Sequence, residues 1–195
     1  MTGTPFSAKP TLVGARVTLR PFRDDDVAAM ATAIADPEVR ILTGSASSTA
    51  EAEADDGRFG DLATWYATRG AQEDRLDLAV EDRQSGRCVG EVVLNEWEPA
   101  NAACNFRILI GPDGRGRGLG TEATTLLLRY AFEDLRLHRV SLGVYAFNPR
   151  ARHVYEKAGF VVEGVDREAL LFDGRRVDMI RMAALAPEWS ARQDA

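Results

Sequence analysis

The sequence is poor in the residues that build disulfide scaffolds and metal centres. Its two cysteines, Cys88 and Cys104, are too few for a disulfide framework, and we expect both to be reduced thiols inside strands. There are only two histidines, and no cysteine or histidine cluster accompanies them. We therefore expect neither a disulfide-stabilised fold nor a metal site.

The chain also lacks an excess of basic residues and any long apolar run. Its net charge of −6 argues against broad nucleic-acid binding, which prefers a basic surface. No run of about 18 apolar residues predicts a membrane span, and residues 1–10 lack the apolar core of a signal peptide. We expect a cytoplasmic protein without nucleic-acid or membrane partners. Its 195 residues, 45% of them hydrophobic, suffice for one sizeable core.

What the sequence does contain is a stretch rich in glycine and arginine, from Asn105 to Gly120. Asn105 to Ile110 is expected to form a strand, because turn residues follow at positions 111–114. A helix should begin after the glycines, since apolar residues then recur at helical spacing. A helix start presents unpaired N–H groups, and glycines keep side chains away from them. The stretch therefore predicts a phosphate-binding loop. The apolar helix face comprises Leu119, Ala123, Leu126, Leu127, Tyr130 and Ala131.

The glycine spacing differs from that of the common nucleotide-binding loops. A Walker loop needs a Lys-Ser/Thr pair after its last glycine, whereas Thr121 and Glu122 follow Gly120 here. Glycines at positions 114, 116, 118 and 120 do not match the dinucleotide fingerprint either. A glycine-rich surface turn before an ordinary helix remains the plain alternative.

The remaining pattern predicts an α/β fold in one domain over residues 12–185, with a flexible leader over 1–11 and a C-terminal tail over 186–195. The expected order is β-α-α-β-β-β-α-β-α-β-β, which gives a mixed, largely antiparallel sheet with helices on both faces. Residues 36–47 are expected to be a loop, and a capping box at Ser48–Glu51 predicts a second helix reaching about Thr68. Asp173-Gly174 predicts a hairpin turn. The other expected elements are strands at Arg16–Pro21, Arg75–Asp82, Cys88–Glu96, Arg139–Val144, Phe160–Glu163, Glu168–Phe172 and Arg175–Met182, and helices behind Asp24–Asp26 and at Arg150–Ala158.

Several segments resemble the GNAT acetyltransferases. Arg115-Gly116-Arg117-Gly118-Leu119-Gly120 matches the Arg-x-x-Gly-x-Gly pyrophosphate loop of that family. The segments R-V-T-L-R-P-F-x-x-x-D, D-P-E-V-R and N-P-x-A-x-x-V-Y-E-K-A-G-F-V-x-E-G resemble the branch that acetylates ribosomal-protein N-termini and related amines. The resemblance implies a GNAT-type sheet with splayed central strands and acetyl-coenzyme A (acetyl-CoA) as co-substrate. It implies an N-acetyltransferase that moves the acetyl group directly to a primary amine.

The resemblance also assigns the cofactor site. Backbone groups of Ile108, Leu109 and Ile110 would contact the pantetheine arm and the acetyl carbonyl. N–H groups from Arg115 through Gly116, Arg117, Gly118, Leu119 and Gly120 to Thr121 would hold the pyrophosphate, with added attraction from the two arginines. Asn148 would bond the cofactor arm, or simply cap a helix. Arg150 and Arg152 would reach the adenosine end, or lie in solvent at a helix start.

By the same resemblance, Tyr155 would be the general acid that protonates the CoA thiolate, a role that suits a phenol since it stays protonated at pH 7. A core aromatic is the alternative. The base is open between Glu91 and Glu96, while either could be a solvent-facing strand residue. Asn105 stands where the family often has a glutamate, and an amide is no base. Trp65, Tyr66 and Trp97 could line the acceptor side or belong to the core.

The acceptor is left open among a protein N-terminus, an amino acid, a polyamine and an aminoglycoside-like drug, and a homodimer is also left open. A non-catalytic module that binds acyl-CoA is the competing function.

Overall fold

The computed structural model describes residues 4–54 and 61–193. It forms one eight-stranded sheet in the order β1-β2-β3-β4-β5-β6-β8-β7, in which only β5 and β6 pair in parallel. The predicted mixed, largely antiparallel fold is confirmed. The strands are β1 Leu12–Val13, β2 Val17–Arg20, β3 Leu76–Asp82, β4 Arg87–Glu98, β5 Ala103–Ile110, β6 Arg139–Tyr145, β7 Val161–Phe172 and β8 Arg175–Leu185. The helices are α1 Asp26–Ala35, α2 Pro37–Leu42, α3 Thr49–Glu53, α4 Leu62–Arg69, α5 Leu119–Arg129, α6 Pro149–Ala158 and α7 Ala186–Gln193.

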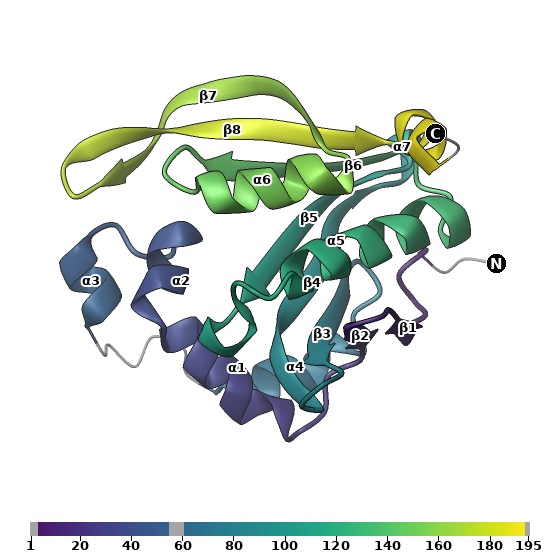
Figure 1. The fold of residues 1–195 in the computed structure, drawn as a ribbon, viewed down its shortest axis with the longest axis horizontal. Coiled ribbons are helices and arrows are strands. Elements are labelled where there is room, and N and C mark those ends of the chain that lie inside the picture. Colours follow the sequence, from purple (N-terminus) through teal and green to yellow (C-terminus); the bar gives the residue numbers. More distant parts are fainter. Residues whose placement is uncertain (1–3, 55–60, 194–195) are drawn as a thin grey trace.

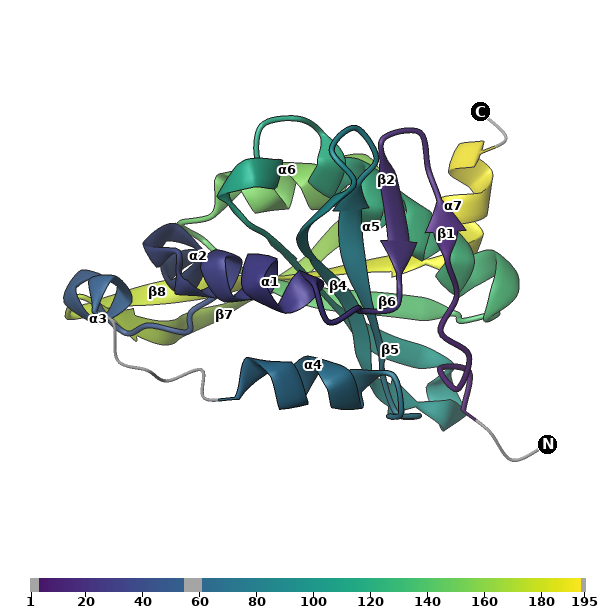
Figure 2. The ribbon, with the colours of Figure 1, turned by 90° about the horizontal axis from the view of Figure 1, so that it is seen from below.

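The helices cover both faces of the sheet (Figures 1 and 2). Helices α5 and α6 lie on one face, and α4 lies on the other (Figure 2). The larger core includes buried Phe106, Leu127 and Tyr155. A smaller core on the α1 and α4 side contains Met30 and Tyr66. Because side chains alternate along a strand, β3, β4 and β5 contribute to both cores.

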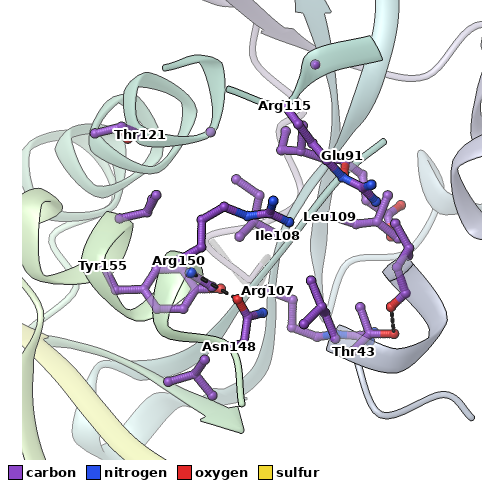
Figure 3. Close-up of a pocket in the computed structure, with 18 of the residues that line it drawn as sticks. Thr43, Glu91, Arg107, Ile108, Leu109, Arg115, Thr121, Asn148, Arg150 and Tyr155 are labelled. Carbon is purple, nitrogen blue, oxygen red and sulfur yellow. Dashed lines mark hydrogen bonds between the residues drawn. The ribbon is translucent and has the colours of Figure 1, made fainter. Parts of the chain in front are cut away.

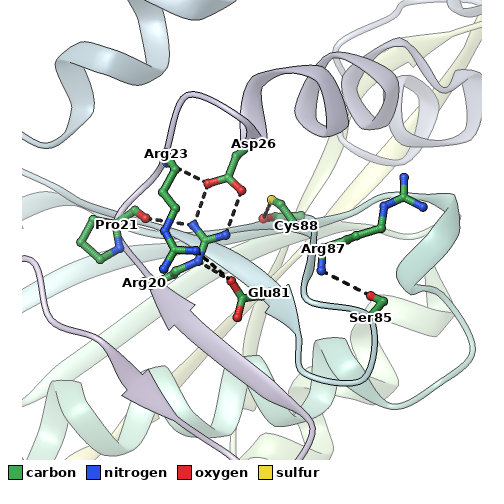
Figure 4. A network of polar contacts seen from close by, with 9 residues as sticks. Arg20, Pro21, Arg23, Asp26, Glu81, Ser85, Arg87 and Cys88 are labelled. Atoms are coloured by element: carbon green, nitrogen blue, oxygen red, sulfur yellow. Dashed lines mark hydrogen bonds and ion pairs between the residues drawn. The ribbon is translucent and has the colours of Figure 1, made fainter.

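A buried ion-pair network fixes the start of α1 (Figure 4). The Arg20 guanidinium donates to Asp26 Oδ2 at 2.7 Å and to Glu81 Oε2 at 2.6 Å. Asp26 Oδ2 also accepts from the Arg23 backbone N–H at 2.8 Å. Because removal of one partner would leave a buried charge unpaired, this network holds α1 firmly against β2 and β3.

The structure corrects two expectations between residues 36 and 68. Residues 37–42 form α2, capped by the Asp36 side chain, where a loop was expected. The predicted N-cap at Ser48 is confirmed, because Ser48 Oγ accepts from the Glu51 N–H. The long second helix is wrong: α3 ends where Ala54 turns extended, and α4 begins separately at an Asp61 cap. Residues 55–60 of that expected helix lie outside the described residues.

The described parts of the expected leader and tail, residues 4–11 and 186–193, contain buried residues that were not expected. Phe6, in the expected leader, is fully buried and packs edge-on against Trp97 with ring centroids 5.8 Å apart. The expected tail forms α7, whose Trp189 is buried against Phe132. The two short strands expected between Phe160 and Phe172 are one strand, β7, bent by two irregularities in its register with β8.

Among the described residues, none of the helices is long and apolar enough to cross a membrane.

Candidate active site

The central feature is a gap between β5 and β6. The two strands pair only where Ala103–Asn105 lies beside Arg139–Ser141, although β5 runs on to Ile110 and β6 to Tyr145. A cavity of about 450 Å³ occupies the gap, and its walls come from β4, β5, β6, α2, α6 and the loop before α5. The predicted splay is confirmed, and it leaves one edge of β5 available to a ligand.

The glycine loop ends in a helix start that is open to an anion. The first backbone bond of α5 runs from the Glu122 N–H to the Gly118 carbonyl, so the N–H groups of residues 119–121 lack intrahelical acceptors. Gly118 occupies the N-cap position at φ +77° and has no side chain to cap them, whereas side chains cap α2, α4 and α6. Gly114, Gly116, Gly118 and Gly120 line the cavity. This arrangement fits the diphosphate of acetyl-CoA.

The two arginines of the loop diverge. Arg115 lines the cavity, but its guanidinium donates to Asp36 Oδ1 at 2.6 Å and contacts Glu38. The side chain of Arg117 points away from the cavity and donates to the buried Asp82 at 3.0 Å. The Arg117 guanidinium therefore lies off the cavity wall, where Asp82 pairs with it. The Leu119 side chain is buried in the core, while its backbone N–H is one of the open groups at the helix start.

Helix α6 contributes the opposite wall (Figure 3). Asn148 caps α6 by accepting from the Ala151 N–H at 3.0 Å, and it also lines the cavity, so both of its expected roles are structurally compatible. Arg150 lines the cavity and donates to Glu38 Oε1 at 2.7 Å. Arg152 instead pairs with Glu156 along the helix surface.

Tyr155 is held by aromatic packing. Its ring lies edge-on to Phe106, with centroids 6.1 Å apart, and also contacts Phe160. The side chain is only 8% exposed and yet lines the cavity. Burial raises the pKa of Tyr155 to about 12, so its hydroxyl carries a proton at neutral pH. Tyr155 is therefore a protonated phenol held in place at the cavity wall, which is compatible with the expected acid.

Glu91 is the carboxylate that the structure brings to the cavity. It lies on β4 opposite Leu109 of β5, and its Oε2 accepts from the Tyr66 hydroxyl at 3.2 Å. Desolvation raises the pKa of the Glu91 carboxyl, and the negative charge of Asp77 acts in the same direction. A carboxylate with a raised pKa is a stronger proton acceptor than an exposed one.

The other base candidate, Glu96, is not at the cavity. It is exposed and has φ +54°, inside the irregular stretch of β4 between Asn95 and Glu98. Asn105, where the family often has a glutamate, donates its amide to Asn95 Oδ1 at 2.9 Å. Of the aromatic residues considered for the acceptor side, Tyr66 belongs to the smaller core and only its hydroxyl reaches Glu91. Trp97 instead packs on Phe6, while Trp65 is 49% exposed.

Among the cavity residues that the sequence analysis missed, three groups are informative. Val39 and Leu42 come from α2, and Thr43 caps its C-terminal end, in a segment that was expected to be a loop. Tyr145 extends β6 into the cavity wall, and Arg107 lies between the expected cofactor strand residues. The D-P-E-V-R segment was a usable signal for α2, because aspartate before proline is a common helix start.

Comparisons with known proteins agree with this geometry. The model of the acetyltransferase (GNAT) domain matches residues 16–161. Over 117 residues the chain is 36% identical to spermidine N(1)-acetyltransferase of Vibrio cholerae, which covers 60% of this chain and 67% of that protein. Over 88 residues it is 32% identical to the [ribosomal protein uS5]-alanine N-acetyltransferase of Escherichia coli, at 45% of each chain. A crystal structure of the Vibrio cholerae spermidine N-acetyltransferase with CoA and spermine superposes with a TM-score of 0.77. The sequence identity is 27%, over 91% of this chain and 99% of the other.

The chain belongs to the GNAT acetyltransferase family. It is an acetyl-CoA-dependent N-acetyltransferase, and the predicted enzyme class and co-substrate are confirmed. The competing function, a non-catalytic module that binds acyl-CoA, receives no support from these relatives.

Proposed function

We propose that the enzyme transfers acetyl directly to a primary amine, with Glu91 as the general base and Tyr155 as the general acid. The observation that carries this proposal is their placement on opposite sides of the cavity. Tyr155 belongs to α6 and packs on the α5–α6 face of the sheet, while Glu91 faces α4 through Tyr66. Figure 3 shows the two residues on opposite walls. A thioester lying in the gap between β5 and β6 would have Tyr155 on the face of its leaving sulfur and Glu91 on the face from which the amine approaches.

The reaction then proceeds in two linked proton transfers. The amine nitrogen attacks the thioester carbonyl carbon while Glu91 takes the proton that the nitrogen loses. Backbone groups on the open edge of β5 are available to the carbonyl oxygen as negative charge develops. The C–S bond breaks as the amide forms, and Tyr155 gives its proton to the departing thiolate. The products are an N-acetyl amine and free CoA.

The cofactor site follows from the same geometry. The open N–H groups at the start of α5 would hold the diphosphate, and Arg150 and Arg115 would approach the phosphates from either side of the cavity. Asn148 would bond the pantetheine arm with the part of its amide that does not cap α6. Spermidine is one acceptor to test, because relatives from Vibrio cholerae and Escherichia coli carry that activity in their names.

The test is release of free thiol from acetyl-CoA with a panel of polyamines, amino acids and peptides with free N-termini. We expect Tyr155→Phe to lower kcat by about 10²-fold, the lower range for losing an acid catalyst, with CoA affinity unchanged by calorimetry. Tyr130→Phe is the matched control, because Tyr130 is partly buried at the end of α5 and lies off the cavity. Wild-type turnover by Tyr155→Phe, or thioester loss independent of any amine, would refute the proposal.

A further inference from the structure

Arg107 is a cavity residue that the proposed chemistry does not use. It lies in the middle of β5 opposite Val93, one alternation away from the pair formed by Leu109 and Glu91. On adjacent antiparallel strands such diagonal neighbours lie about 7–8 Å apart, within reach of a long side chain. Arg107 is exposed and lines the cavity (Figure 3).

The side chain of Arg107 lies on the acceptor side of the sheet. Its neighbours Phe106 and Ile108 face the other way, because Phe106 packs on Tyr155 and Ile108 approaches Gly120. Leu109 packs with the α1–α4 core, on the face of Glu91. Since strand residues alternate, Arg107 shares the face of Leu109. It is therefore separated from the phosphate loop and close to the place where the amine must bind.

The positive charge of Arg107 acts to lower the pKa of the nearby Glu91 carboxyl, but its guanidinium donors have no partner in the described part of the chain. The other two arginines of the cavity, Arg115 and Arg150, donate to Asp36 and Glu38. Within residues 4–54 and 61–193, no hydrogen bond or ion pair engages the Arg107 guanidinium. The nearby Glu91 has the Tyr66 hydroxyl as its partner instead. An arginine with five unused donors in a binding cavity is suited to grip a carboxylate.

We propose that Arg107 selects acceptors that carry a carboxylate close to the amine, so that the substrate class is amino-carboxylates such as free amino acids. This inference rests on the proposed function, because Glu91 must take the proton from the amine that Arg107 positions. A polyamine would instead bring a second positive charge toward this guanidinium, which opposes binding. Arg107 acts as a specificity residue for the acceptor and takes no part in holding the phosphates.

The experiment compares acceptors that differ only in the carboxylate. Kinetics of wild type, Arg107→Gln and Arg107→Lys are measured with alanine, alaninamide and spermidine. We expect Arg107→Gln to lower the alanine-to-alaninamide ratio of kcat/KM at least tenfold, mainly by raising KM for alanine. Arg107→Lys should retain part of the preference for alanine. Spermidine turnover should be unchanged or improved in Arg107→Gln. The control is Arg129→Gln, which removes the same charge from the end of α5, away from the cavity.

The outcomes separate the two proposals. An unchanged ratio in Arg107→Gln overturns this inference while amine acetylation by the wild type keeps the proposed function. An equal loss of kcat/KM with all three acceptors in Arg107→Gln, accompanied by a shifted acid limb of the pH profile, also overturns this inference. Arg107 would then act only by its effect on the charge of Glu91. No thiol release with any amine would overturn both.

Discussion

Glu38 is the residue whose replacement tests the cofactor site most directly. It stands in the first turn of α2, and its carboxylate contacts Arg115 and accepts from Arg150 Nη2 at 2.7 Å. These two arginines approach the cavity from the α5 loop and from α6. A carboxylate that bridges them competes with the phosphates of acetyl-CoA for the same cations. Glu38→Gln should therefore bind CoA more tightly than the wild type.

The magnitude follows from how exposed the contacts are. The side chains of Glu38 and Arg150 are 46% and 57% exposed, and pairs of this kind contribute about 0.2–1 kcal/mol each. Arg115 is better buried and keeps Asp36 at 2.6 Å, so Glu38→Gln releases Arg150 fully and Arg115 only in part. A net gain of about 0.5–1 kcal/mol corresponds to roughly two- to fivefold tighter CoA binding.

Calorimetric titration with CoA measures this difference at low and at high salt. The matched control is Glu156→Gln. Glu156 forms an exposed ion pair with Arg152 of the same helix, α6, at 2.8 Å and lies off the cavity. The advantage of Glu38→Gln should shrink at high salt, because exposed charges are screened. Equal or weaker CoA binding by Glu38→Gln would show that Glu38 orders the arginines for the phosphates, and would refute the competition.

Two further predictions concern the loop and the base. Gly118→Asp should weaken CoA binding at least tenfold more than Gly118→Ala, because both variants strain a residue at φ +77° but only the aspartate adds a negative charge at the diphosphate site. Calorimetry together with urea unfolding separates affinity from stability, and equal affinities would count against the site. Glu91→Gln should lower kcat/KM by about 10²–10⁴-fold. Burial raises the pKa of Glu91, so its stabilising contribution is complete below the unfolded value and is lost as pH rises through the folded one. Glu91→Gln should therefore match the wild-type free energy of unfolding near pH 4 and exceed it near pH 8; the opposite order in urea unfolding would contradict this sign.

Local chemical signals explain what the sequence could predict. The glycines before α5, the Asn148-Pro149 start of α6 and the Asp173-Gly174 turn each act within a few residues, and the structure shows all three where expected. The length of the helix after Ser48 is different, because packing decides where a short helix ends. The burial of Phe6 depends on Trp97, and no pattern within the first ten residues encodes that distant partner.

The loop arginines show where sequence spacing stops being informative. Arg115 and Arg117 occupy equivalent places in an alternating Arg-Gly pattern. Glycines at φ +70° and +77° reverse the backbone between and after them, and acids far away in sequence then capture each guanidinium. The ion pair with Asp36 holds Arg115 at the cavity, while the ion pair with Asp82 holds Arg117 away from the cavity. The division of roles is therefore decided by tertiary partners.

Glu91 and Glu96 differ in a way that strand geometry does explain. Glu91 lies in the regular part of β4 and faces α4, whereas Glu96 lies at φ +54° in the irregular stretch after Asn95, where the strand alternation is interrupted. The sequence alone does not say which face holds the acceptor, because that depends on α4 bringing Tyr66 beneath β4. Once that helix is placed, the same alternation puts Arg107 and Glu91 on one face and Phe106 with Tyr155 on the other. The gap between β5 and β6 is then the route by which a group on one face can reach the other, and the proposed division between acid, base and acceptor depends on that gap.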